Sequence, residues 1–189
     1  MVIIMVLEII LIVLVVIVIL AGLWIVGTYN GLITLRTRID NAWAQIEVFL
    51  KRRYDLIPNL VETVKGYAKH EKETLENVMK ARAGLMTGST EDRMQANNML
   101  SQTLKSLFAV TEAYPNLKAN ENFLELQREL SSTENGIASV RSQYNNTVEP
   151  YNRTIQQFPS NIIAGMFGFL ARPWFEAPAA EREAPKVKF

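Results

Sequence analysis

The side chains that most often carry out catalysis are scarce in this chain of 189 residues. It contains no cysteine and a single histidine, His70. These counts exclude disulfides, thiolate zinc sites, iron–sulfur clusters and a cysteine nucleophile, and they leave no histidine pair for a metal. His70 lies among charged neighbours, in Ala-Lys-His-Glu-Lys, a pattern typical of an exposed helical histidine.

Glutamates at helical spacing are the second group that could do chemistry. Two sets stand out: Glu71, Glu73 and Glu76, and Glu121, Glu125 and Glu129. Carboxylates on one helical face can hold a metal, but a di-metal carboxylate bundle also needs Glu-x-x-His pairs, which the sequence lacks. It also has no phosphate-binding glycine loop, nucleophile elbow or H-E-x-x-H motif. We therefore predict that the protein is not an enzyme and binds no metal or other cofactor.

Several polar residues lie on or beside apolar helical stripes in the middle and the last third of the chain. They are Asn41, Arg53, Asp55, Asn59, Glu134, Asn135, Arg141 and Asn145. Polar groups that are buried must pair with one another, and such pairs fix the register between helices. We predict an interhelical polar network, and a ligand pocket is the alternative interpretation.

The charge is distributed unevenly along the chain. Lysine and arginine number 20 against 19 acidic residues, a balance of +1 that argues against wholesale nucleic-acid binding. Every basic residue lies at Arg36 or later, and only Glu8 is charged before it. From Ile9 to Val26 the chain is uncharged and almost entirely Ile, Leu and Val, and as a helix it would be about 27 Å long. This length and composition predict a transmembrane helix.

The flanks of this stretch favour a retained membrane helix over a cleaved signal peptide. Residues 1–8 carry no lysine or arginine, and no cysteine follows the Leu20-Ala21-Gly22 triplet. The expected membrane-interface residues are Trp24, Tyr29, Arg36 and Arg38. Their positive charges predict that the N-terminus lies outside and that residues 30–189 lie in the cytoplasm, with an external domain as the alternative.

The rest of the chain has helical periodicity and no strand pattern. We predict an all-α fold in which the transmembrane helix continues into an antiparallel up-and-down bundle of three to four long helices. The first helix is expected to reach about Leu85, with a kink at Pro58 favoured over a reversal there. Ser89 and Asn120 are expected to cap the next two helices. The expected segments are a short N-terminal tail (1–8), the transmembrane helix (9–29), the bundle (30–160), an apolar C-terminal segment (161–172) and a flexible tail (173–189).

Two apolar features have no evident partner in this scheme. The second helix is too short to cover the membrane-proximal stripe, which predicts self-association into a homo-oligomer through these residues: Leu32, Leu35, Ile39, Trp43 and Ile46. The apolar C-terminal segment is interpreted as a cover on the bundle. The alternative is an element that docks on the membrane interface or on a partner through Ile162, Phe167 and Phe169.

Longer motifs carry a resemblance to a known family. They are RIDNAWAQI (38–46), KRRYDLIPNLVETVKGY (51–67), YPNLKANENF (114–123), LSSTEN (130–135), RSQYN (141–145) and FPSN (158–161). In these segments, across nearly the whole chain, the sequence resembles the LemA family of bacterial membrane proteins. The resemblance implies one transmembrane helix in the bacterial inner membrane, an external N-terminus, a cytoplasmic helical bundle and no enzymatic activity. It also suggests membrane zinc proteases or TPM-domain membrane proteins as partners.

Three functions compete at this stage. The favoured one is a membrane-anchored scaffold or adaptor that organises the membrane or partner proteins. A transmembrane signalling stalk is the first alternative, although about eight residues outside would leave almost no sensor. A carboxylate-dependent enzyme is the second alternative, and the missing motifs count against it.

Overall fold

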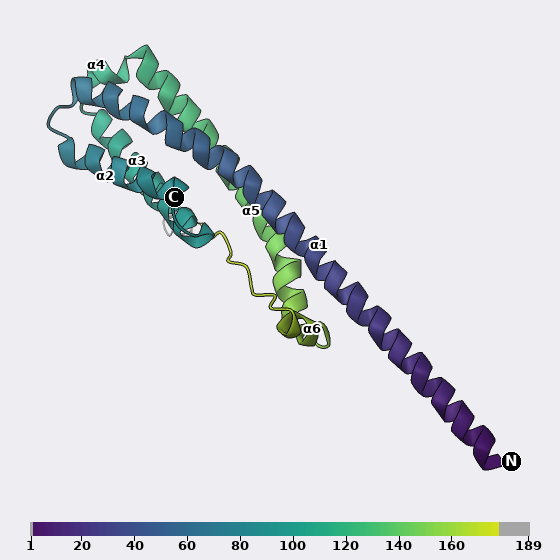
Figure 1. The fold of residues 1–189 in the computed structure, drawn as a ribbon. Coiled ribbons are helices and arrows are strands. Elements are labelled where there is room, and N and C mark those ends of the chain that lie inside the picture. The colour runs from purple at the N-terminus through teal and green to yellow at the C-terminus, as the bar shows by residue number, and fades with distance from the viewer. Residues whose placement is uncertain (1, 178–189) are drawn as a thin grey trace, which may run out of the picture. The chain divides into compact units, whose positions relative to one another are not determined.

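The computed structural model describes residues 2–177, and every regular element in that range is helical (Figure 1). The elements are α1 (Val2–Tyr67), α2 (Lys72–Ala83), the 3-10 helix η1 (Gly84–Met86), α3 (Thr90–Thr111), α4 (Pro115–Lys118), α5 (Glu121–Gln156) and α6 (Ser160–Met166). The predicted all-α fold with a long apolar helix at its N-terminal end is confirmed.

The helix α1 continues through Pro58 instead of ending there. A proline inside a helix removes the N–H that would bond to the carbonyl four residues earlier, here that of Tyr54. Arg82 of α2 supplies a replacement donor, because its Nε lies 2.8 Å from the Tyr54 oxygen. Its guanidinium carbon also lies 3.5 Å from the centre of the Tyr54 ring. The chain therefore does not reverse at Pro58.

The reversal occurs ten residues later, so the prediction of one helix reaching about Leu85 is wrong. α1 ends at Tyr67, residues 68–71 form a turn, and α2 begins at Lys72. The turn itself contains neither glycine nor proline, although Gly66 lies in the last turn of α1, and residues 68–71 have ordinary helix propensity. Turning here lets α2 pack beside α3 and bury Leu75, Val78 and Ala81. This packing outweighs the local preference to continue the helix.

The start of α3 follows a local sequence signal. Gly88 has a φ of +84°, which is favourable only for glycine, and it turns the chain just before the helix. The Ser89 hydroxyl then accepts the Asp92 backbone N–H, while the Asp92 carboxylate accepts the Ser89 backbone N–H at 2.8 Å. This reciprocal capping box satisfies two donors at the helix start. Asn120 likewise accepts the Phe123 N–H at 2.9 Å at the start of α5.

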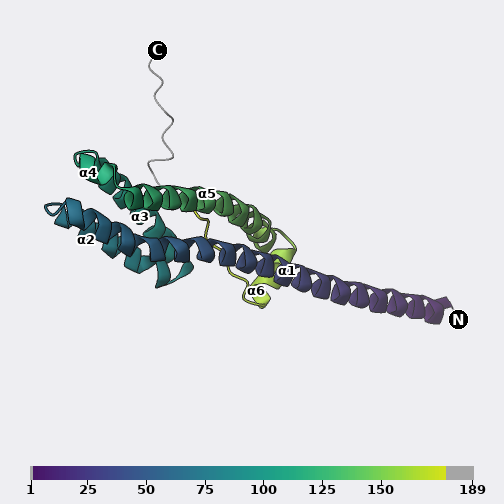
Figure 2. The ribbon, with the colours of Figure 1, turned by 90° about the horizontal axis from the view of Figure 1, so that it is seen from above.

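The described residues form two compact units, and α1 and α5 each contribute to both. The four-helix unit contains residues 41–146 and 173–177. In it the second part of α1, α2, α3 and the first part of α5 run up and down beside one another (Figures 1 and 2). Its core includes Leu60, Leu100, Leu104, Ile137 and Tyr144, all of them buried.

The second unit, here the α6 unit, contains residues 2–40 and 147–172. It consists of the first part of α1, the end of α5, α6 and the extended segment that follows α6. The part of α1 from Val2 to Leu20 is exposed along its whole length. Further along, Leu32 and Ile39 are buried, as are Tyr151 and Phe169.

The stripe predicted to lack a partner is covered within the chain. Leu32, Ile39 and Ile46 are at most 1% exposed, and Leu35 and Trp43 are half-buried. The premise of self-association through this stripe is therefore wrong. The reason is that α5, with 36 residues, accompanies α1 in both units. In the four-helix unit, for example, the Trp43 ring lies 5.8 Å from that of Tyr144.

Candidate functional site

The turn between α1 and α2 borders a groove within the four-helix unit. It has a volume of about 690 Å³. Its apolar floor is formed by Val61 and Ala68 from α1 and the turn, and by Leu75 and Met79 from α2. Three of these residues are buried, whereas Met79 remains 37% exposed. Among the described residues, Met79 is therefore the part of the apolar floor that remains open to solvent.

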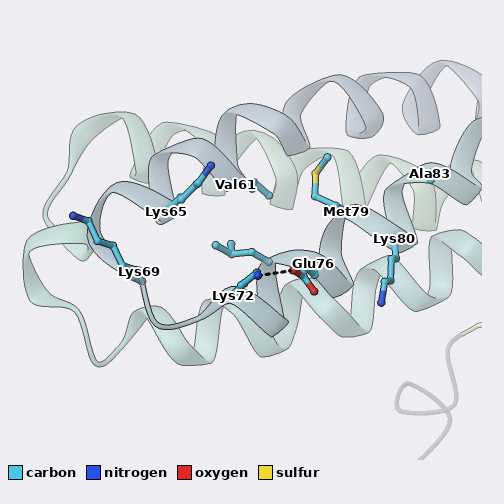
Figure 3. Close-up of a pocket in the computed structure, with 10 residues that line it drawn as sticks. Val61, Lys65, Lys69, Lys72, Glu76, Met79, Lys80 and Ala83 are labelled. Carbon is cyan, nitrogen blue, oxygen red and sulfur yellow. Dashed lines mark ion pairs between the residues drawn. The ribbon is translucent and has the colours of Figure 1, made fainter.

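Lysines surround this apolar floor. They are Lys65 on α1, Lys69 in the turn, and Lys72 and Lys80 on α2. Figure 3 shows Lys65 and Lys72 closer to Val61 and Met79, whereas Lys69 and Lys80 are directed outward. Glu76 is the one acidic side chain in the lining, and its carboxylate lies 3.8 Å from the Lys72 ammonium. An apolar floor inside a cationic rim favours a ligand that combines apolar groups with carboxylates or other anions.

Sequence reasoning missed this groove. Its signal is weak, because lysines on both sides of an apolar stripe are also normal on a solvated helix. The groove exists because the chain turns at residues 68–71, which places the lysines of α1 and the turn close to those of α2. That turn was not predicted, so the two sets of lysines were not expected to meet.

An ion pair between the buried Arg53 and the half-buried Glu134 lies in the four-helix unit. The Arg53 side chain is 2% exposed, and its Nη2 lies 2.7 Å from Oε2 of Glu134. Its Nη1 donates to Asn97 Oδ1 at 2.6 Å and to Ser101 Oγ at 3.1 Å. Ser101 donates in turn to Glu134 at 2.8 Å. Burial lowers the pKa of Arg53, and the nearby Glu134 carboxylate partly offsets this. These contacts join α1, α3 and α5 and fix their register.

The other members of the predicted network do not join this pair. Asn41, Asp55, Asn59 and Asn135 are exposed, and the Asp55 carboxylate pairs with the exposed Lys51. Two members that were not predicted, Asn97 and Ser101, complete the network instead. The signal for them was present: with Met94 and Leu104 they follow a three-four-three spacing on the buried face of α3.

Arg141 and Asn145 contact the segment that follows α6. The Arg141 guanidinium lies 5.9 Å from the centre of the Phe175 ring. Asn145 accepts the backbone N–H of Phe175 at 2.9 Å and donates to its carbonyl at 3.0 Å. Phe175 is 1% exposed. Residues 173–177 therefore differ from the flexible tail expected for them, and residues 178–189 of that tail lie outside the described range.

Asn152 repeats the same arrangement in the α6 unit. It accepts the backbone N–H of Arg172 and donates to the Arg172 carbonyl, both at 2.8 Å. Asn145 and Asn152 are seven residues apart on α5, which is two helical turns. Each primary amide thus binds both main-chain groups of one residue in the segment after α6.

The remaining candidate catalytic or metal-binding residues, His70 and the glutamates, do not form a reactive site among the described residues. His70 is exposed, and it lies in the turn after α1 instead of within a helix. Glu71 accepts a hydrogen bond from the Tyr114 hydroxyl at 3.1 Å, and Glu129 pairs with Arg52. Within residues 2–177, no three His, Cys, Asp or Glu side chains gather as a metal site would require.

The expected membrane-interface residues all lie on α1. Trp24 is 42% exposed, Tyr29 is half-buried, and Arg36 and Arg38 are exposed. The stretch before them is long and apolar enough to cross a membrane, and none of it is buried in the protein. Of the candidate docking residues, Ile162 and Phe167 are about half exposed, whereas Phe169 is buried.

Comparisons with known proteins agree with this architecture. Protein LemA of Metamycoplasma hominis is 26% identical, and the match covers 83% of this chain and 73% of that protein. Magnetosome protein MamQ 2 of Paramagnetospirillum magneticum and magnetosome protein MamQ of Magnetospirillum gryphiswaldense are 25% and 24% identical. Each of these two matches covers 81% of this chain and 66% of the relative.

The exposed apolar stretch of α1 and these relatives together support a membrane-associated protein. The model of the LemA family matches residues 42–189, which include the four-helix unit except Asn41, and the region after α5. Since the match extends over most of the sequence, the chain belongs to the LemA family.

Proposed function

We propose that this protein is a membrane-anchored adaptor that holds an acidic, amphipathic helix of a partner protein in the groove between α1 and α2. The observation that carries the proposal is the composition of the groove, an apolar floor with four lysines and one glutamate around it. Grooves of this kind bind helices through apolar anchors spaced three and four residues apart. The lysines would pair with carboxylates on the flanks of such a helix and reject basic ones.

The residues that line the groove suit an adaptor better than an enzyme. Its lining lacks histidine, serine and any pair of carboxylates, so it offers no general acid–base pair or nucleophile system. Its rim is made of flexible, solvated ammonium groups, which attract charge without fixing one reacting atom. Binding, and not bond making, is the activity that these side chains support.

The proposed setting is the bacterial inner membrane, with the N-terminus outside and the groove in the cytoplasm. Support comes from Arg36 and Arg38, which closely follow the uncharged stretch, and from the absence of lysine and arginine before it. Basic residues near a span are retained on the cytoplasmic side.

The proposal can be tested with the full chain in lipid nanodiscs and a synthetic probe. The probe is a fluorescent amphipathic peptide of about 16 residues, long enough to form a helix when bound. It carries leucines on one face and glutamates on the other. Fluorescence anisotropy should show saturable binding that weakens as salt is added, because salt screens exposed charges. The same peptide with every glutamate replaced by lysine should not bind.

Matched variants separate the groove from the overall charge. Lys65→Glu with Lys69→Glu should weaken binding of the acidic peptide about tenfold, and Met79→Asn should weaken it by removing apolar contact without changing the charge. The control, Lys105→Glu with Arg128→Glu, makes the same change in net charge at exposed positions outside the groove lining. An equal loss of affinity in both double variants would show that the peptide is attracted only by the overall charge, and this result would overturn the proposal. Absence of binding by either peptide would also overturn it.

A further inference from the structure

Large apolar side chains are exposed around α6 in the α6 unit. They are Phe158, Ile162, Met166, Phe167 and Leu170, each between 51% and 82% exposed. No charged residue occurs between Arg153 and Arg172 in the sequence. Isolated exposed apolar residues are common, but five within one short, uncharged segment mark an interaction surface.

This surface has two sides with different roles. On α6, Ile163 and Ala164 are 2% exposed and pack into the α6 unit. Ile162 and Met166 lie on the opposite face of the same helix and point away from the unit. The helix therefore has one face that holds it in place and one apolar face that the described residues leave uncovered.

Aromatic contacts place α6 beside a definite part of α1. The Tyr29 ring centre lies 4.8 Å from that of Phe167 and 5.7 Å from that of Phe169. Tyr29 follows the uncharged apolar run of residues 9–26 by less than one helical turn. Figures 1 and 2 both show α6 next to α1. The exposed surface thus lies level with the end of the apolar run.

Hydrogen bonds hold the segment after α6 in this position. The Tyr151 hydroxyl donates to the Leu170 carbonyl at 2.9 Å. The Arg172 guanidinium pairs at 2.8 Å with the carboxylate of Asp40, the last residue of the α1 portion in this unit. The Tyr151 hydroxyl is protonated at neutral pH and can donate, and burial raises its pKa further. The apolar side chains are consequently presented by a fixed backbone and cannot turn inward without breaking these bonds.

We propose that residues 157–171 lie in the interface of the bilayer that α1 crosses, with the exposed side chains of the α6 segment inserted among the lipids. The inference rests on α1 as a transmembrane helix and goes beyond the proposed adaptor role. A lipid surface fits better than a protein partner because the patch is level with the end of the membrane run and carries no charge. An uncharged, apolar surface at that level has the composition of the boundary between headgroups and acyl chains.

The absence of cysteine allows a direct test of depth. Single variants Ile162→Cys, Met166→Cys and Leu170→Cys are labelled with a nitroxide in the full chain. The protein is reconstituted at high lipid excess into vesicles of phosphatidylethanolamine and phosphatidylglycerol. Electron paramagnetic resonance then compares collisions with oxygen, which concentrates in lipid, and with a water-soluble nickel chelate. All three replaced side chains are exposed, so the substitutions leave the packing intact, and circular dichroism checks this.

Two reference positions make the outcome decisive. Leu14→Cys lies in the apolar run and reports α1 itself, whereas Ser142→Cys is exposed on α5 and reports water. We expect an oxygen-to-nickel ratio several-fold above that of Ser142→Cys at all three α6 positions. A ratio equal to that of Ser142→Cys overturns the inference, and so does protection from both reagents, which would mean burial against protein. A water-like ratio at Leu14→Cys would instead remove the transmembrane helix on which both proposals depend.

Discussion

Arg82 provides the hydrogen bond that Pro58 withholds from the Tyr54 carbonyl, and it does so from a different helix. An unpaired carbonyl in a half-buried position is costly, and water is the usual substitute when a proline interrupts a helix. Here the donor is charged, so the bond is stronger than a neutral one. The guanidinium also stacks on the Tyr54 ring. The proline is thus tolerated inside α1 because a side chain of α2 compensates for it.

This pairing predicts a strong coupling between the two positions. Arg82→Met should lower the free energy of unfolding by about 2 kcal/mol, the range for a lost hydrogen bond to a charged donor. In a Pro58→Ala background the cost should fall by about 1 kcal/mol, because alanine restores the N–H that reaches Tyr54. Urea unfolding of the full chain in detergent, followed by circular dichroism, measures all four corners of the cycle. Strictly additive changes would show that Arg82 does not compensate for the proline.

At the scale of elements, some helix ends can be predicted from the local sequence and others cannot. The start of α3 is determined by nearby residues, namely Gly88, Ser89 and Asp92. The sequence predicted it, with Ser89 as the cap. The end of α1 is not determined in this way, because residues 68–71 contain no strong turn signal and the apolar spacing continues into α2. There the packing of α2 against α3 decides where the helix ends, and no pattern in one helix contains that information.

The polar residues likewise differ in how far the sequence predicts their contacts. Arg53 and Glu134 were predicted as two of eight members of an interhelical polar network, because polar groups among buried apolar positions need partners. Which of the eight pair with each other was not predicted. Arg141 and Asn145 were predicted as members of the network, but their contacts with Phe175 were not. The groove formed by the lysines was not predicted either. These contacts and the groove depend on the path of residues 173–177 and on the turn after α1, which are tertiary features. Sequence thus indicates which polar groups need partners more readily than it indicates which partners they find.

The capping box of α3 has a pH dependence with a definite sign. Hydrogen bonds from the Ser89 side chain and backbone lower the pKa of Asp92. A carboxyl whose pKa is lower in the folded state contributes stability above its unfolded pKa of about 3.9, and loses it as the pH falls through the folded value. Ser89→Ala should therefore lower the unfolding free energy by about 1 kcal/mol at pH 7, and this gap should narrow below about pH 4.

Thermal unfolding at pH 7 and at pH 3 measures this effect. A loss of about 1 kcal/mol corresponds to a fall in Tm of about 3 °C for a chain of this size. Glu91→Gln is a suitable control, because Glu91 is the neighbouring exposed acid in the same first turn and is not part of the capping box. A gap that stays the same at both pH values would show that the Asp92 carboxylate takes no part in the cap.

At the scale of the whole molecule, the sequence consists of an almost uncharged apolar stretch and a remainder that carries nearly all of the charged residues. The first 35 residues carry one charge, and all 20 basic residues follow them. This asymmetry was read directly from sequence and needs no tertiary information. It also predicts sidedness, since the basic flank of a membrane helix faces the cytoplasm.

Sidedness can be measured with one cysteine in the four-helix unit. Ser142→Cys in right-side-out vesicles should be protected from a membrane-impermeant maleimide, and in inverted vesicles it should react. Detergent should make it reactive in both preparations, which controls for local accessibility. Reaction in intact right-side-out vesicles would place the four-helix unit outside the cell and reverse the proposed orientation.

Asn145 and Asn152 recognise the backbone of Phe175 and Arg172 and not their side chains. Such hydrogen bonds do not depend on which side chain the bound residue carries. They do require asparagine at the position on α5. Only a primary amide of this length offers one donor and one acceptor at the required separation, so aspartate or glutamine cannot replace either asparagine. Among related chains, the two α5 amides should consequently stay constant, whereas positions 172 and 175 are restricted only by their own side-chain contacts, the ion pair with Asp40 and the buried Phe175 ring. An alignment would reveal this difference without any knowledge of activity.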